Sequence, residues 1–93
     1  MKNKIKKISV IIPVLNEQKN ISYLLDEIIN TLQKRIIYEI VVVDDGSTDE
    51  TIKSIKEKIK KISLLKLVAH KKNYGQSSSI RTGILNSKYD HIV

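Results

Sequence analysis

Two short runs of branched apolar residues constrain the fold of this chain more than any other feature. Residues 8–12 read Ile-Ser-Val-Ile-Ile, and residues 39–43 read Glu-Ile-Val-Val-Val. A strand with one face in water alternates apolar and polar residues, whereas a strand covered on both faces is apolar at consecutive positions. We therefore expect both runs to form central strands of a parallel sheet.

Helical periodicity follows each of these runs. Between residues 21 and 32, and again between residues 52 and 62, apolar side chains recur three or four positions apart, as on one face of a helix. Shorter patterns predict a third strand over residues 64–69, a helix over residues 76–86 and the opening of a fourth strand at residues 89–93. This alternation of strands and helices predicts an α/β fold with a parallel sheet.

Polar residues near the expected helix starts predict how the first two helices begin. Asn16 or Asn20 is placed to cap the first helix. Ser47 is followed three positions later by Glu50, which fits a capping box at the start of the second helix. The lysines of the second helix are expected to face solvent.

Length and composition restrict the class of protein. The 93 residues allow one domain, over residues 1–93, and the absence of cysteine excludes disulfides and thiolate metal sites. A cysteine-free chain fits a reducing compartment, so we expect a cytoplasmic location. No apolar run approaches the roughly 20 residues that cross a bilayer. The net charge of +7 comes almost entirely from dispersed lysines, so nucleic acid is not the expected partner.

The expected topology brings three polar loops together. Right-handed crossovers place the carboxyl ends of parallel strands at one edge of the sheet, where ligands of open α/β sheets bind. Residues 13–17, 44–47 and 70–75 follow the first three strands. We expect these loops to form a common crest.

The acidic loop at residues 44–47, Asp-Asp-Gly-Ser, is the most informative of the three. An ionised carboxylate only accepts hydrogen bonds, so it suits ribose hydroxyls or the N–H edge of a base and repels phosphate. From spacing alone, an equally good alternative is that one acid caps the turn while the other is solvated. The acids lack the alternating spacing of an EF-hand loop, and their position after the second strand disfavours a phosphoacceptor receiver domain.

No glycine-rich phosphate-binding motif is present in the sequence. Neither Gly-x-Gly-x-x-Gly nor Gly-Lys-Ser/Thr occurs, so no such loop would cradle a diphosphate. A nucleotide diphosphate bound here would need a metal ion or basic groups from elsewhere.

Three motifs, in order along the chain, resemble family 2 glycosyltransferases. They are Ile-Ile-Pro-Val-Leu-Asn-Glu at 11–17, Val-Val-Val-Asp-Asp-Gly-Ser-Thr-Asp at 41–49, and Asn-Tyr-Gly at 73–75 followed by Gly83. The nearest subgroup is that of the polyprenyl-phosphate sugar synthases, similar to dolichyl-phosphate mannosyltransferase. The resemblance implies a Rossmann-like three-layer GT-A fold, truncated here at the fourth strand. It also implies a nucleotide-sugar donor of the UDP or GDP type, Mg²⁺ or Mn²⁺, and transfer with inversion.

The resemblance also assigns roles to individual residues. Pro13, Leu15 and Glu17 would line the nucleoside pocket, although Leu15 replaces a tyrosine often found there and so weakens the case for base stacking. Val43 and Asp45 would contact base and ribose, with Asp44 supporting them. Asn73 and Gly75 would shape the neighbouring loop. Arg81 and the serines at 77–79 are expected to pack or to be solvated, and His70 to be an ordinary loop residue.

The metal ligands and the general base of the family are expected beyond Val93. We therefore expect this chain to hold the nucleoside-binding half of the enzyme and to be inactive alone. The implied acceptor is polyprenyl phosphate, which would place a longer form at the cytoplasmic face of the membrane. Two alternatives remain: a non-catalytic nucleotide-binding module, and a basic protein that binds nucleic acid or a membrane surface.

Overall fold

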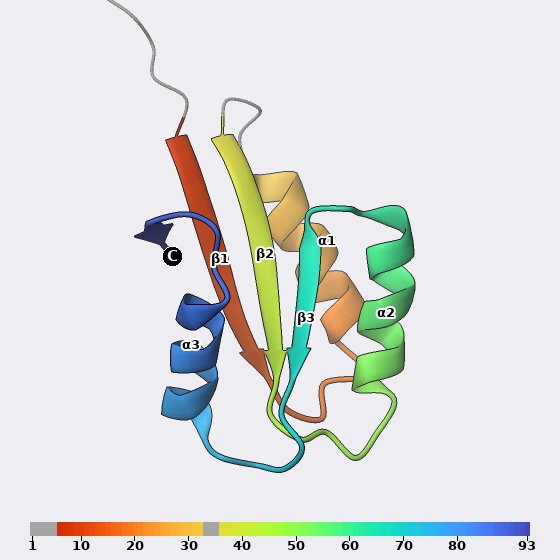
Figure 1. The fold of residues 1–93 in the computed structure, drawn as a ribbon. Helices are drawn as coiled ribbons and strands as arrows, with labels where there is room; N and C mark the ends of the chain where they lie inside the picture. Colours follow the sequence, from red (N-terminus) through yellow and green to blue (C-terminus); the bar gives the residue numbers. More distant parts are fainter. Residues whose placement is uncertain (1–5, 33–35) are drawn as a thin grey trace, which may run out of the picture.

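A computed structural model describes residues 6–32 and 36–93. Four parallel strands form one sheet in the order β3-β2-β1-β4 (Figure 1). The elements are β1 (Lys6–Val14), α1 (Ile21–Thr31), β2 (Ile36–Asp44), α2 (Thr51–Lys61), β3 (Leu65–Ala69), α3 (Gln76–Leu85) and β4 (His91–Ile92). The alternation of elements predicted from the sequence is confirmed.

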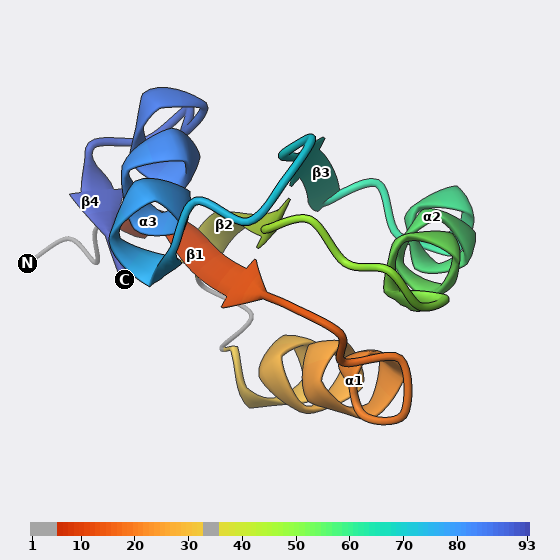
Figure 2. The ribbon, with the colours of Figure 1, turned by 90° about the horizontal axis from the view of Figure 1, so that it is seen from below.

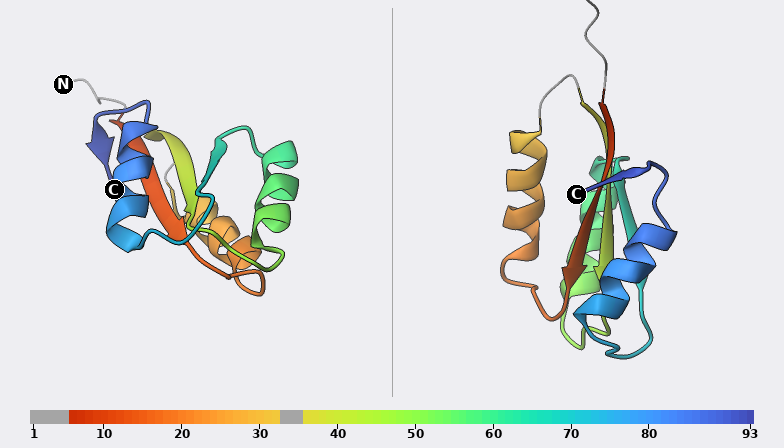
Figure 3. Two further views of the ribbon diagram at one scale, coloured as in Figure 1. Left: turned by 60° about the horizontal axis from the view of Figure 1, so that its bottom comes forward. Right: turned by 90° about the vertical axis from the view of Figure 1, so that its left-hand side faces the viewer.

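The helices lie on both faces of the sheet. Seen along the strands, α1 and α2 lie on one side of the sheet and α3 on the other (Figure 2). The side view in Figure 3 shows the same three layers, with α1 and α3 separated by the strands. A strand in the middle of such an arrangement has no face in water, which accounts for the consecutive apolar residues of β1 and β2.

The main core lies between the sheet and the pair α1–α2. Ile12 and Ile40 of the strands pack there with Leu25 of α1 and Ile55 of α2. Leu25, Ile40 and Ile55 are completely buried. The helical stripes predicted from the sequence therefore face the sheet.

The opposite face of the sheet is covered by α3 at close range. A Cβ atom placed on Gly83 would lie 2.4 Å from Ile11 Cγ2 and 3.3 Å from Val43 Cγ2. Only a glycine allows the helix backbone to approach the strands this closely. Val43 is completely buried on this side.

β1 extends through Pro13 to Val14, beyond the run at residues 8–12 that was expected to form the strand. Pro13 lies two residues after Ile11 and pairs with Val43 of β2. The Ile11 N–H points to the other side and donates to the Val93 carbonyl at 3.0 Å. Successive N–H groups along a strand point to opposite sides, so the nitrogen of Pro13 faces β4, as the Ile11 N–H does. β4 pairs only with Ile8 and Ser9, so no ladder hydrogen bond is lost at Pro13.

The two predicted side-chain caps are wrong. Asn20 is the N-cap residue of α1 and Glu50 that of α2, but neither makes a side-chain capping bond. The Ser47 hydroxyl and N–H both donate to the buried carboxylate of Asp44 instead. The Asn16 amide oxygen accepts a hydrogen bond from the Thr48 N–H.

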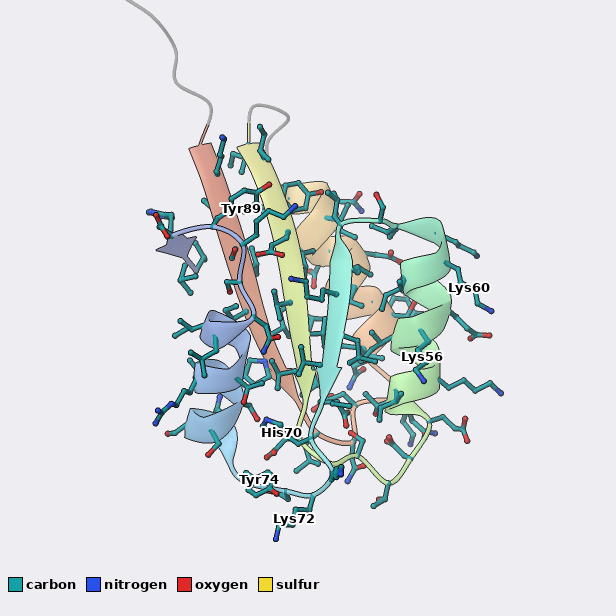
Figure 4. The ribbon with its side chains drawn as sticks, viewed as in Figure 1. Lys56, Lys60, His70, Lys72, Tyr74 and Tyr89 are labelled. Carbon is teal, nitrogen blue, oxygen red and sulfur yellow. The ribbon has the colours of Figure 1, made fainter. Side chains whose placement is uncertain are left out.

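The lysine-rich face of α2 is mostly exposed, with one exception. Lys56 and Lys60 lie on α2 in Figure 4 and are exposed. Lys58 is only 19% exposed and forms a 2.6 Å ion pair with Asp26 of α1. This lysine therefore joins two helices, whereas the sequence placed it in solvent.

A buried carboxylate holds the turn before β4. Glu39 of β2 accepts hydrogen bonds from the Ser9 hydroxyl, at 2.6 Å, and from the Lys88 N–H. Burial raises the pKa of Glu39, but these two hydrogen bonds and the charge of Lys66 outweigh it and leave the pKa below its ordinary value.

Across residues 6–32 and 36–93 we find no helix of the length and apolarity that a membrane span requires.

Candidate functional site

A pocket of about 400 Å³ opens at the carboxyl ends of the strands. In Figure 1 this edge is the lower one, where the three long strands end and their loops turn. The lining residues come from the end of β1 and the loop after it, from the residue that follows β2, and from the loop before α3 together with the first turn of that helix. They are Pro13, Val14, Leu15, Glu17, Asp45, Asn73, Gly75, Gln76 and Ser79.

Most residues singled out in the sequence meet in this pocket. The lining includes Pro13, Leu15, Glu17, Asp45, Asn73 and Gly75. Val43 and Asp44 do not belong to it, because Val43 is buried beneath α3 and Asp44 is buried behind the loop at residues 45–47. These two can act on a ligand only through their neighbours.

The first wall of the pocket is fastened to the loop before α2. Asn16 adopts a left-handed conformation with φ of 52°, and its N–H donates to the Ser47 hydroxyl at 2.8 Å. The next residue, Glu17, donates its N–H to the Thr51 hydroxyl at 2.8 Å. Together with the Asn16–Thr48 bond, these contacts form a polar latch between residues 16–18 and 47–51.

Two further residues complete the polar latch. The Gln18 side-chain oxygen accepts a hydrogen bond from the Glu50 N–H at 2.8 Å. Asp49 accepts from the Gln18 N–H at 3.4 Å and from both the hydroxyl and the N–H of Thr51, and the bonds from Thr51 in particular hold the pKa of Asp49 below its ordinary value. The motif at residues 44–51 therefore serves largely to position the loop after β1.

Asp44 and Asp45 have different surroundings. The Asp44 carboxylate accepts from the hydroxyl and the N–H of Ser47, and the same hydroxyl accepts from Asn16. Asp45 lines the pocket and is held by the segment at residues 70–75. The two adjacent acids thus divide into one that fixes the loop and one that faces the pocket.

Three donors surround the Asp45 carboxylate. His70 Nδ1 and the Tyr74 N–H both approach Oδ1, at 2.8 and 2.9 Å, and the Gly75 N–H donates to Oδ2 at 2.8 Å. The hydrogen bond from His70, followed by those from the backbone, lowers the pKa of Asp45 below its ordinary value. Asp45 is therefore ionised near neutral pH and can only accept hydrogen bonds.

His70 lies in the loop after β3, as predicted, but contacts of both its ring nitrogens were not predicted. Its Nε2 lies 2.8 Å from the Thr82 hydroxyl of α3, so the ring bridges Asp45 and the helix. Figure 4 shows His70 and Tyr74 together at the end of β3, and their rings meet edge to face at 5.3 Å. The sequence carried no signal for this contact, because Asp45, His70 and Thr82 meet only through the packing of α3.

Two glycines are required by the shape of the site. Gly46 has φ of +85°, and a Cβ there would lie 2.7 Å from the Lys72 carbonyl carbon. Gly75 has φ of +102° and is the N-cap residue of α3. Both conformations are unfavourable for residues with a side chain, so these positions favour glycine.

Three lining residues were not expected from the sequence: Val14, Gln76 and Ser79. Ser79 is buried, and its hydroxyl donates to the Gly75 carbonyl at 3.1 Å. It lies four residues after Gly75, one helical turn into α3, so a helix beginning at Gly75 places it beside the loop. The four-residue spacing could have indicated that Ser79 lines the pocket, but only once the helix was known to begin after Gly75.

The lining suits an uncharged group that carries hydrogen-bond donors. Pro13, Val14 and Leu15 supply apolar surface, while Glu17 and Asp45 supply acceptors, and no lysine or arginine belongs to the lining. Such a surface repels a phosphate. Over the described ranges 6–32 and 36–93, no cluster of three or more His, Cys, Asp or Glu could hold a metal ion.

A second hollow, of about 460 Å³, lies at the opposite edge of the sheet. Its lining includes Glu39, Lys66 and Tyr89. Figure 4 places Tyr89 far from His70 and Tyr74. The Glu39 carboxylate already bonds to Ser9, Lys88 and Lys66, so it stabilises the fold. The carboxylates of the first pocket, in contrast, can accept hydrogen bonds from a ligand.

Comparisons with known proteins identify the family of the chain. The sequence model of glycosyl transferase family 2 matches residues 9–93. Human dolichyl-phosphate beta-glucosyltransferase is 34% identical over an alignment that covers 95% of this chain. The chain spans 30% of the length of that relative.

Two solved structures share the fold. The mannosyltransferase PcManGT from Pyrobaculum calidifontis, in complex with GDP-Man and Mn²⁺, has a TM-score of 0.75 and 28% identity, covering 87% of this chain and 24% of its own. S. aureus TarS 1-349 in complex with UDP has a TM-score of 0.79 and 31% identity, covering 94% of this chain and 26% of its own. The expected Rossmann-like GT-A architecture is confirmed, and the chain belongs to glycosyl transferase family 2.

Proposed function

We propose that the pocket binds the nucleoside part of a nucleoside diphosphate sugar. The observation that carries the proposal is the convergence of apolar surface from Pro13 and Leu15 with the carboxylates of Glu17 and Asp45. A nucleoside presents an apolar base face together with N–H and hydroxyl donors, and this lining complements both. Asn73 and Gly75 would shape the side of the pocket formed by the loop before α3, as the resemblance implies.

Val43 and Asp44 would act from behind the lining. Val43 fills the space under α3, and Asp44 fixes Ser47 and thereby the latch to Asn16. Their substitution is expected to change nucleotide affinity by moving Asp45 and Glu17.

The whole protein, of which these residues would form the nucleotide-binding part, is proposed to transfer the sugar to an acceptor with inversion. A UDP or a GDP donor fits the proposal, since one similar structure holds GDP-Man and another UDP. Mg²⁺ or Mn²⁺ would assist the whole enzyme, as Mn²⁺ accompanies the donor in PcManGT. The described residues offer no ligand set for that ion, so we assign them no metal-dependent step.

Polyprenyl phosphate is the proposed acceptor. The support is the similarity to a dolichyl-phosphate glucosyltransferase and the motif resemblance to polyprenyl-phosphate sugar synthases. Because such an acceptor resides in a membrane and sugar nucleotides are aqueous, the proposed site of action is the cytoplasmic face of a membrane.

Calorimetric titration of the 93-residue chain with UDP and with GDP tests nucleotide binding. The pocket variant is Glu17→Ala, because the Glu17 side chain lines the pocket and only its N–H joins the latch. Glu27→Ala is the matched control, since Glu27 is an exposed residue of α1 outside the pocket. Loss of a hydrogen bond to a charged group lowers affinity about tenfold or more, so we expect that loss for Glu17→Ala and none for Glu27→Ala.

Absence of binding to both nucleotides would refute the proposed pocket, as would equal effects of the two substitutions. Nucleotide affinity that falls steeply with salt, together with binding of DNA, would favour the basic-surface alternative.

A further inference from the structure

The Asp45 carboxylate is almost fully occupied before any ligand arrives. A carboxylate offers about four acceptor positions on its two oxygens. His70 and the Tyr74 N–H use Oδ1, and the Gly75 N–H uses one position on Oδ2. The protein thus leaves room for one further donor, on Oδ2.

His70 is the only side chain among these three donors, and its orientation is fixed at both ends. Because Asp45 is ionised, the proton of the shared bond belongs to His70 Nδ1. In the neutral ring Nε2 then accepts from the Thr82 hydroxyl, which lies 2.8 Å away on α3. The His70 side chain is only 12% exposed and that of Asp45 7%, so little water competes for this bond.

We propose that His70, oriented by Thr82, is a positioning residue that holds the Asp45 carboxylate with its open Oδ2 position toward a single N–H or hydroxyl donor of the ligand. The inference rests on the proposed nucleotide site and adds to it a residue that contributes no lining surface. Without the His70 bond, Oδ1 would regain an open position, and only the backbone N–H groups of Tyr74 and Gly75 would hold the carboxylate.

Paired substitutions separate the hydrogen bond from the packing of the ring. His70→Leu keeps a branched side chain and removes both hydrogen bonds. His70→Asn places an amide N–H near the position of Nδ1, so it can restore the bond to Asp45 without reaching Thr82. Thr82→Val keeps the shape of the threonine and removes its hydroxyl.

Affinities for UDP and GDP are measured by calorimetry for the 93-residue chain and these variants, with folding checked by circular dichroism. We expect His70→Leu to weaken binding about tenfold, because a charge-assisted hydrogen bond is lost. We expect His70→Asn to stay within about threefold of the parent and Thr82→Val to fall between them. Amide exchange at Tyr74 and Gly75 should be faster in His70→Leu than in His70→Asn.

The outcomes separate this inference from the proposed function. If the parent chain binds neither nucleotide, the nucleotide site itself is refuted. If the parent binds and His70→Leu binds equally well, or if folded His70→Leu and His70→Asn are equally weakened, the positioning role is refuted. Should His70→Leu not fold, unchanged affinity in Thr82→Val would refute the orientation of His70 by α3.

Discussion

At the scale of single residues, the site depends on hydrogen bonds between segments that are distant in sequence. Ser47 illustrates this: its hydroxyl donates to the buried Asp44 carboxylate and accepts from the Asn16 N–H. A hydroxyl used in both directions cannot be replaced by an apolar group without leaving a buried acceptor under-satisfied.

Ser47→Ala is therefore expected to destabilise the chain by about 1–3 kcal/mol, the usual cost of an unsatisfied buried polar group. Urea unfolding followed by circular dichroism measures the change. Ser77→Ala, at an exposed position of α3, is the control and should change stability little. Equal stability of the two variants would show that the Asp44–Ser47–Asn16 chain contributes nothing to folding.

At the scale of elements, α3 is held to the sheet by contact of its backbone with strand side chains. Gly83 lies close to Ile11 and Val43 of the sheet. On the other face, α1 and α2 meet through the Asp26–Lys58 ion pair. The two contacts differ in kind, so their substitution should have unequal effects.

Gly83→Ala is expected to destabilise the chain by about 1–3 kcal/mol through overpacking, in spite of a gain of about 1 kcal/mol in helix propensity. The added methyl group would meet Ile11 Cγ2. Ile11→Ala removes that atom, so Gly83→Ala should cost less in an Ile11→Ala background. Urea unfolding of the four chains gives the coupling, and strictly additive effects would contradict the proposed clash.

The Asp26–Lys58 pair should contribute below about 1 kcal/mol, because the Asp26 side chain is half exposed. A double-mutant cycle with Asp26→Asn and Lys58→Met measures the coupling. Raising the salt concentration to about 1 M should reduce it, since exposed charges are screened. A coupling that is large and insensitive to salt would mean that the pair is more buried in solution than its geometry indicates.

At the scale of the whole molecule, carboxylates held by hydrogen bonds make stability depend on pH. The pKa values of Glu39, Asp45 and Asp49 are all lowered in the folded chain. The unfolded chain therefore binds protons first as the pH falls. The stabilisation is complete above the ordinary carboxyl pKa of about 4 and is lost progressively at lower pH.

We expect the urea midpoint to fall between about pH 4 and pH 2, at constant ionic strength. Asp49→Asn removes one of the three groups, so its midpoint should fall less steeply over the same interval. Because the substitution removes one negative charge, Glu57→Gln serves as a charge-matched control; Glu57 is an exposed residue of α2. An identical slope for Asp49→Asn and the parent would contradict the lowered pKa.

Much of the fold could be predicted from the sequence, because β1, β2 and the first two helices carry strong apolar periodicity. Most of the pocket could also be predicted, since strand ends and motifs mark Pro13, Glu17 and Asp45. The resemblance assigned Asp45 to the ligand and Asp44 to a supporting role, but the environment that separates the two acids could not be predicted, because both follow the same strand. It depends on Ser47 on one side and His70 on the other.

The polar latch has a practical consequence for altering ligand preference. Leu15 and Glu17 line the pocket, whereas Asn16 and Gln18 bond to the loop before α2 through their side chains. Neighbouring positions therefore carry separate tasks. Randomising residues 15, 17 and 76 should change ligand preference while the loop keeps its position. Randomising residues 16 and 18 should instead yield mostly chains in which the loop after β1 is no longer held in place.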